Sequence, residues 1–133
     1  MELERQVCSL RLAKRLKELR VKQESLFWWG NYVRTGILPE YNRNKLHYGK
    51  YGDAFEPTCA AFTVAELGEM LPRYFQTVRC VGKTLPWQCS HDDLAWHEKH
   101  EAIHADIEAD ARAKMLIYLL EHKLISSAGG HSV

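Results

Sequence analysis

The segment DIEADARAKMLIYLLEHKLI, residues 106–125, constrains the fold more than any other part of the chain. Its apolar residues form two adjacent rows at helical spacing, a pattern wider than the single stripe of a surface helix. The rows consist of Ile107, Ala111, Met115 and Leu119, and of Leu116, Leu120 and Leu124. Acidic residues stand at its beginning and His122 and Lys123 near its end, an order that complements the helix macrodipole. We therefore predict a helix over about 107–125 that is buried around much of its circumference.

The composition is typical of one globular domain, because 133 residues contain 46% hydrophobic and 26% charged residues. No apolar stretch is long enough to span a bilayer, and the start MELERQ has no apolar region of the kind found in secretion signals. We therefore expect a cytoplasmic protein without membrane insertion. The cysteines, Cys8, Cys59, Cys80 and Cys89, are irregularly spaced, and we expect reduced thiols.

The net charge of +1 hides an asymmetry along the chain. Residues 1–50 contain 11 Lys and Arg against 5 Asp and Glu, whereas residues 51–133 contain 7 against 12. The two parts therefore carry about +6 and −5. This division either leaves a basic face for an anion, a nucleic acid or an acidic partner, or is neutralised where the two parts pack together.

The amino-terminal region predicts an amphipathic helix over about 10–20, with Ser9 as its N-cap. One side carries leucines and an alanine, and the other carries Lys and Arg. The basic side has the chemistry to contact nucleic acid, but a solvated basic face is the commoner explanation, so nucleic-acid binding is the weaker alternative.

The aromatic stretch ESLFWW predicts a strand, and the following residues, about 30–60, read as a long irregular insertion with a short hairpin around HYGKYG. Tyrosines alternate there with basic residues, a mixture that stacks on rings and pairs with anions. The predicted binding residues are Trp28, Trp29, Tyr41, Arg43, Lys45, Tyr48 and Tyr51. The alternative is that the tyrosines cover an edge of the core while the basic groups stay in water.

The middle of the chain contains a capping box, in which Thr63 and Glu66 begin a short helix that ends near Leu71. The stretches RYFQTVRCVG and LPWQCSH then predict an antiparallel pair of strands. We therefore predict a single α+β domain over 1–125, in which a small, mostly antiparallel sheet packs against the N- and C-terminal helices. Residues 126–133 are expected to be a flexible tail.

Three stretches resemble a group of small phage and prophage proteins usually described as hypothetical. They are CSLRLAKRLKELRVKQESLFWW from Cys8, AFTVAELGEMLP from Ala61 and ADARAKMLIYLLEHKLI from Ala109, a little under half of the chain. The resemblance implies a viral origin and carries no activity with it. The chain departs from the group at Arg20, where a helix-ending Gly would be natural, at Ile107, where a capping Thr would be, and between Trp29 and Ala61. This inserted segment is where a specialised function would most easily reside.

One group of residues suggests metal chemistry. The candidate zinc ligands are Cys80, Cys89, His91, His97, His100 and His104. The segment contains neither a CxxC pair nor an HExxH sequence, so buried thiols and solvated histidines are the commoner explanation.

No catalytic signature is complete in the sequence, so we expect a non-enzymatic, phage-encoded intracellular binding protein without a cofactor. Its partner is either a host protein, which would make it an inhibitor of a host process such as antiviral defence, or a small anionic, nucleotide-like ligand. A metal-dependent hydrolase or nuclease built on the cysteines and histidines of residues 80–104 is the alternative.

Overall fold

The computed structural model describes residues 2–33, 41–52 and 54–126. In chain order the elements are the 3-10 helix η1 (Leu3–Arg5), α1 (Leu10–Glu18), β1 (Phe27–Tyr32), β2 (Lys45–Tyr48), β3 (Phe55–Ala60), α2 (Val64–Met70), β4 (Phe75–Arg79), β5 (Trp87–His91), α3 (Leu94–His97), β6 (Ile103–Ala105) and α4 (Glu108–Glu121). The predicted tail lies outside the described residues, except for Ser126. No described helix is both long enough and apolar enough to cross a membrane.

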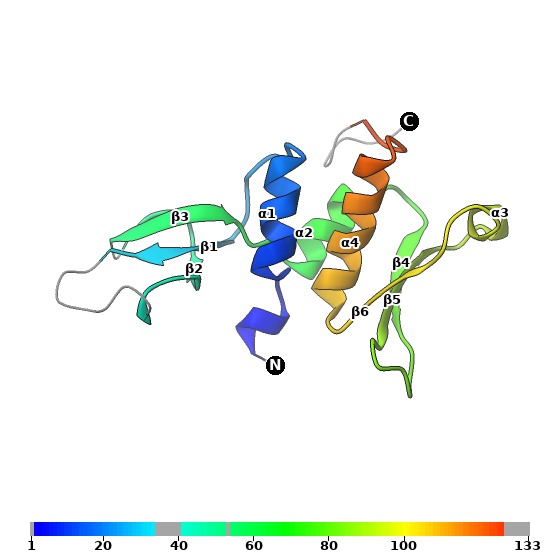
Figure 1. The fold of residues 1–133 in the computed structure, drawn as a ribbon, viewed down its shortest axis with the longest axis horizontal. Coiled ribbons are helices and arrows are strands. Elements are labelled where there is room, and N and C mark those ends of the chain that lie inside the picture. Colours follow the sequence, from blue (N-terminus) through cyan, green and yellow to red (C-terminus); the bar gives the residue numbers. More distant parts are fainter. Residues whose placement is uncertain (1, 34–40, 53, 127–133) are drawn as a thin grey trace.

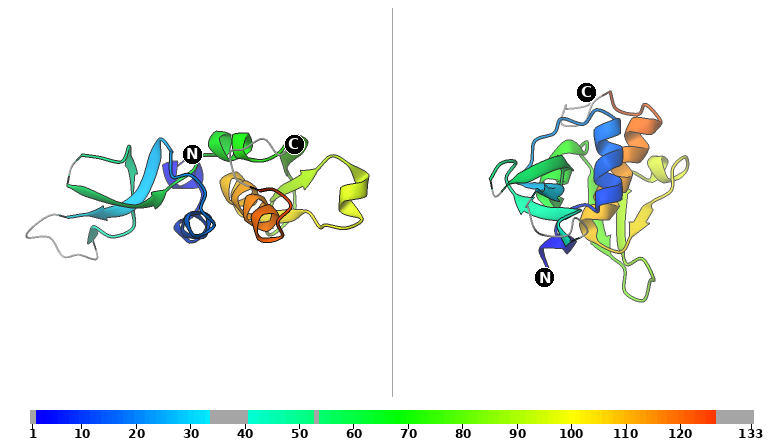
Figure 2. Two further views of the ribbon diagram at one scale, coloured as in Figure 1. Left: turned by 90° about the horizontal axis from the view of Figure 1, so that it is seen from above. Right: turned by 60° about the vertical axis from the view of Figure 1, so that its left-hand side comes forward.

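The strands form two antiparallel sheets that lie on opposite sides of a group of helices (Figures 1 and 2). Sheet 1 has the strand order β2-β1-β3, and sheet 2 has the order β4-β5-β6. Helices α1, α2 and α4 lie between the sheets, with α1 next to sheet 1 and α4 next to sheet 2 (Figure 1). The predicted α+β class with antiparallel strands beside the N- and C-terminal helices is confirmed, and the strands are divided between two sheets.

Helix α4 is the centre of the core, as its apolar rows predict. It packs against α1, α2 and the strands of sheet 2, and its buried residues point in several directions. The buried residues are Ala109, Ala111, Ala113, Met115, Leu116, Ile117 and Leu119. The helix ends at Glu121, earlier than predicted, because Lys123 adopts a left-handed backbone conformation with φ of 55°. Leu124 is consequently 41% exposed and does not continue the buried row.

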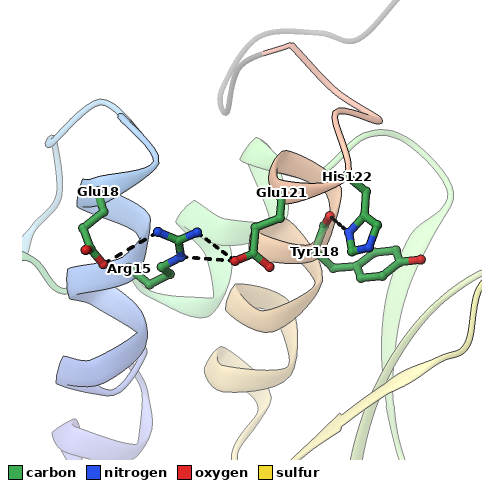
Figure 3. Close-up of polar contacts among 5 residues, drawn as sticks. All are labelled: Arg15, Glu18, Tyr118, Glu121 and His122. Carbon is green, nitrogen blue, oxygen red and sulfur yellow. Dashed lines mark hydrogen bonds and ion pairs between the residues drawn. The ribbon is translucent and has the colours of Figure 1, made fainter.

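Helices α1 and α4 are joined by polar contacts at both ends, and Figure 3 shows the contacts near their last turns. Near their first turns, the Ser9 amide donates to Asp110 Oδ1 at 2.7 Å. Near their last turns, Arg15 donates to Glu121 Oε2 from Nη2 at 2.9 Å and from Nε at 3.2 Å. Ser9 is the N-cap of α1, but its hydroxyl makes no capping bond, so the predicted cap is correct in position and different in chemistry.

The predicted capping box of α2 is confirmed. The Thr63 hydroxyl accepts from the Glu66 amide at 3.1 Å, and Glu66 Oε1 accepts from the Thr63 amide at 2.9 Å. The same carboxylate also accepts from the Ser25 hydroxyl and the Leu26 amide, immediately before β1. Glu66 therefore ties the start of α2 to the start of sheet 1.

Sheet 1 replaces much of the irregular insertion that the sequence predicts over residues 30–60. Strands β2 and β3 both pair with β1 and do not pair with each other, so no hairpin forms around HYGKYG. Gly30 allows the close approach of β1 to β3, since a Cβ there would lie 2.2 Å from the Glu56 carbonyl oxygen and 2.6 Å from Phe55 Cζ. Residues 34–40 and 53 of this segment lie outside the described residues.

Sheet 2 contains the predicted antiparallel pair β4 and β5, with Thr77 opposite Cys89. Strand β6, which the sequence analysis missed, completes the sheet beside β5. Arg112 of α4 connects this sheet to α2, because its Nε donates to the Thr77 hydroxyl at 3.2 Å and its Nη1 donates to the Val64 carbonyl at 3.0 Å. The guanidinium also lies 3.6 Å from the Glu108 carboxylate.

Candidate functional site

The two tryptophans predicted to bind a ligand belong to the core. Trp28 is 6% exposed and Trp29 is 9% exposed. The indole of Trp29 donates to the Cys8 carbonyl at 2.9 Å, and that of Trp28 donates to the Ser25 carbonyl at 3.2 Å. Their side chains therefore hold sheet 1 against the segments that flank α1, and a role on an exposed binding surface does not fit them.

The other predicted binding residues are exposed and lie on or beside the edge strand β2 (Figure 1). We define the tyrosine surface as Tyr41, Arg43, Lys45, Tyr48, Lys50 and Tyr51. The exposed fractions of its tyrosines are 66% for Tyr41, 70% for Tyr48 and 81% for Tyr51. Such rings offer a large contact area and lose little rotamer entropy when a partner covers them.

The tyrosine surface wraps around the edge of sheet 1. Successive side chains of a strand point to opposite faces, so Lys45 and Tyr48 project on different sides of β2. Two ring contacts position the neighbouring side chains: Tyr48 meets Phe27 edge to face with ring centroids 5.5 Å apart, and Lys50 Nζ lies 5.1 Å from the centroid of the Trp28 ring. The buried Trp28 thus contributes to the tyrosine surface indirectly, because its ring positions the Lys50 ammonium group through a cation–π contact.

The basic groups of the tyrosine surface are not neutralised by carboxylates in the described part of the chain. Arg43 and Lys45 are exposed and form no ion pair with another residue that the structure describes. Together with Lys50 they place three positive charges among three exposed tyrosines. This arrangement can pair with carboxylates or phosphates while the rings cover apolar area.

The structure does not gather the candidate zinc ligands. Within the described ranges, no group of three or more His, Cys, Asp or Glu side chains is placed to hold a metal ion. Cys89 is fully buried in β5, where desolvation raises the pKa of its thiol to about 12, which disfavours the thiolate that zinc requires. Cys80 Sγ instead contacts Gln88 Oε1 at 3.2 Å.

Several of the histidines pack as aromatic rings. Trp96 lies between His91, at a centroid distance of 5.5 Å, and His100, at 4.1 Å. His100 continues the row to Tyr118 of α4, whose hydroxyl lies 2.7 Å from His100 Nδ1. The tilted ring of His122 lies against the same tyrosine, with ring centroids 4.1 Å apart (Figure 3). This cluster was not predicted from the sequence, although the spacing of four residues between Trp96 and His100 was a signal for it.

The remaining candidate ligands are also placed for structural contacts. His97 Nε2 donates to the His91 carbonyl at 2.6 Å, which stabilises the short α3 turn. His104 lies in β6 opposite Gln88, and its carbonyl accepts from Lys114 Nζ at 3.0 Å.

Comparisons with protein-family models, with curated proteins and with solved structures found no match to this chain.

Proposed function

We propose that the protein is a non-enzymatic binding protein, and that its tyrosine surface binds an acidic surface of a partner protein. The observation that carries this proposal is the exposure of Tyr41, Tyr48 and Tyr51, each by about two thirds or more, on a segment that also carries Arg43, Lys45 and Lys50. Tyrosine and arginine dominate the energetics of protein interfaces.

The shape of this surface favours a protein over a small ligand. Small-molecule sites are concave and bury most of the ligand surface. The tyrosine rings instead project into solvent around the edge of a sheet, where a large partner can cover them from outside.

The charge of the surface selects the chemistry of the partner. Three cations without a described carboxylate partner attract an acidic protein and accelerate encounter with it at low ionic strength. Strand β2 is only four residues long and begins with Lys45, features that hinder pairing with a strand of another chain. Recognition therefore depends on side chains.

The resemblance to small phage and prophage proteins supports a partner in the host cell. A phage protein that covers an acidic patch on a host protein would block whatever that patch binds. We therefore propose inhibition of a host process, such as antiviral defence, as the biological role.

The experiment is a pull-down from host lysate with nuclease treatment, followed by calorimetry with the purified partner. Truncation of Arg43, Tyr48 or Tyr51 to Ala should lower the affinity by about fivefold or more in at least one case, without a change in melting temperature. Tyr74→Ala is the matched control, because Tyr74 is 65% exposed and lies beside sheet 2. Affinity should also fall as salt is added.

Three results would contradict the proposal. Capture that disappears with nuclease would indicate nucleic acid as the partner. Equal effects of Tyr48→Ala and Tyr74→Ala would place the interface elsewhere. If every truncation lowers the melting temperature by several degrees and none affects binding, the tyrosines serve to cover the edge of the core and not to bind a partner.

A further inference from the structure

A cavity of about 670 Å³ lies where both sheets meet the first turns of α2 and α4. It shares no residue with the tyrosine surface. Its lining includes Arg5, Phe27, Val64, Arg79, Trp87 and Glu108. The volume lies within the range of small-molecule sites.

The cavity exists because the face of sheet 2 that packs on α4 extends beyond the first turn of that helix. Thr77 of β4 donates its hydroxyl to Glu108, the first residue of α4. The next pair on the same face of the sheet, two residues further along, is Arg79 opposite Trp87. No turn of α4 covers this pair, and Figure 1 shows the β4–β5 hairpin continuing past the start of the helix.

The charges in the cavity leave one cation uncompensated. Glu108 is engaged by Thr77 and by Arg112, and Arg5 lies 3.5 Å from Asp106. Arg79 forms no ion pair with any residue in the described part of the chain. Its guanidinium is therefore the group available for a ligand anion.

The walls supply apolar area and two rings. Trp87 lines the cavity beside Arg79, and Phe27 lines it from sheet 1. Both side chains are partly exposed, so a ring placed against them would remove apolar surface from water. Val64 of α2 adds a further apolar contact.

We propose that this cavity binds a small organic anion that consists of a planar aromatic body and one anionic group. The aromatic body lies against Trp87 and Phe27, and the carboxylate, sulfonate or phosphate pairs with Arg79. This ligand site is separate from the protein-binding surface proposed above.

The test uses 8-anilinonaphthalene-1-sulfonate, a fluorescent aromatic anion, titrated into the native protein. We expect one site, and in Arg79→Gln an affinity about tenfold lower, the effect of losing one charge-assisted hydrogen bond. The control is Arg73→Gln, which makes the same charge change at an exposed arginine that does not line the cavity. Its affinity for the probe should lie within about twofold of that of the wild-type protein. Near-ultraviolet circular dichroism confirms that each variant is folded.

Competition identifies the ligand class. AMP and indole-3-acetate carry an aromatic body and an anion, whereas adenosine and indole are their neutral counterparts. We expect at least one of the two anions to displace the probe, and its neutral counterpart to leave the probe bound. Displacement by AMP would indicate a nucleotide as the ligand, and displacement by indole-3-acetate would indicate an aromatic carboxylate.

Other outcomes overturn the proposal. It is wrong if the folded protein does not bind the probe, if several probe molecules bind, or if Arg79→Gln and Arg73→Gln behave alike. Equal displacement by the neutral and the anionic compounds would also exclude an anion site. Trp87→Leu provides an independent check, because it removes the ring while keeping the cation, and unchanged probe affinity would exclude this wall.

Discussion

Replacement of Gly30 by Ala tests the packing of sheet 1 directly. The added methyl group would lie 2.2 Å from the Glu56 carbonyl oxygen and 2.6 Å from Phe55 Cζ. An ordinary carbon–oxygen contact is about 3.3 Å or longer, so the two strands must separate locally by about 1 Å. The nearest obstacle is backbone in the middle of a sheet, and no side-chain rotation removes it.

The magnitude follows from the groups that must move. Separation of β1 from β3 weakens the pairing around Gly30 and Asn31, and a backbone group left unsatisfied costs about 1–3 kcal/mol. Displacing the Phe55 ring, which is 8% exposed, adds an overpacking cost of about 1–3 kcal/mol. Alanine recovers about 0.4–1 kcal/mol by restricting the unfolded chain. We expect a net destabilisation of about 3 kcal/mol.

Urea denaturation followed by circular dichroism measures this loss, and Gly68→Ala is the matched control. A Cβ at Gly68 would lie 2.1 Å from Arg112 Nη1, the far end of a flexible side chain, and alanine improves the helix by about 1 kcal/mol. We expect a change below about 1 kcal/mol there, because the lost bond from Arg112 to Val64 offsets that gain. A larger loss for Gly68→Ala than for Gly30→Ala would refute the argument from backbone rigidity.

Three further predictions concern the core and its ionisable groups. Leu119 is 1% exposed, so Leu119→Ala should lower the free energy of unfolding by about 2–5 kcal/mol. A decrease below about 1 kcal/mol in urea denaturation would show that the buried environment of Leu119 is misassigned. Burial raises the pKa of Asp110 above its usual value despite the bonds from Ser9, so the folded state binds more protons and wild-type stability falls as pH rises from the unfolded pKa through the folded one. Asp110→Asn keeps the acceptor without the charge, so its stability relative to wild type should increase over this interval in urea titrations at several pH values; a decrease would contradict the direction of the shift. Burial raises the pKa of the thiols of Cys8, Cys59 and Cys89, whereas Cys80 is partly exposed. Ellman's reagent at pH 8 should therefore modify about one thiol in the native protein and the others only after unfolding, and rapid modification of all four would contradict their burial.

The parts of the fold that the sequence predicted are those set by local patterns. The rows of α4 are visible because a helix buried on many sides needs apolar residues at nearly every turn. The capping box of α2 and the pair β4–β5 depend on residues close together in the chain.

The errors arose where distant pairing decides the structure. Strand β2 has four residues and β6 has three, too few for periodicity to register, and both are stabilised by a neighbouring strand. Trp28 and Trp29 were misassigned because aromatic residues serve core and interface equally, and their burial depends on contacts with segments such as Cys8. The cavity could not be predicted, since it arises from the difference in length between a hairpin and a helix.

The contact between α1 and α4 has a consequence for synthesis on the ribosome. The bonds from Ser9 to Asp110 and from Arg15 to Glu121 join residues 101 and 106 positions apart. Both sheets can form while translation proceeds, because each is made from strands that are close in sequence. Part of the apolar side of α1, with Leu12 and Leu16, packs against α4, and at about 5–20 residues per second the roughly 100 residues that separate the two helices take about 5–20 s to synthesise. During that interval β3 can cover part of the apolar side of α1, and the part that α4 covers in the folded protein is exposed to solvent.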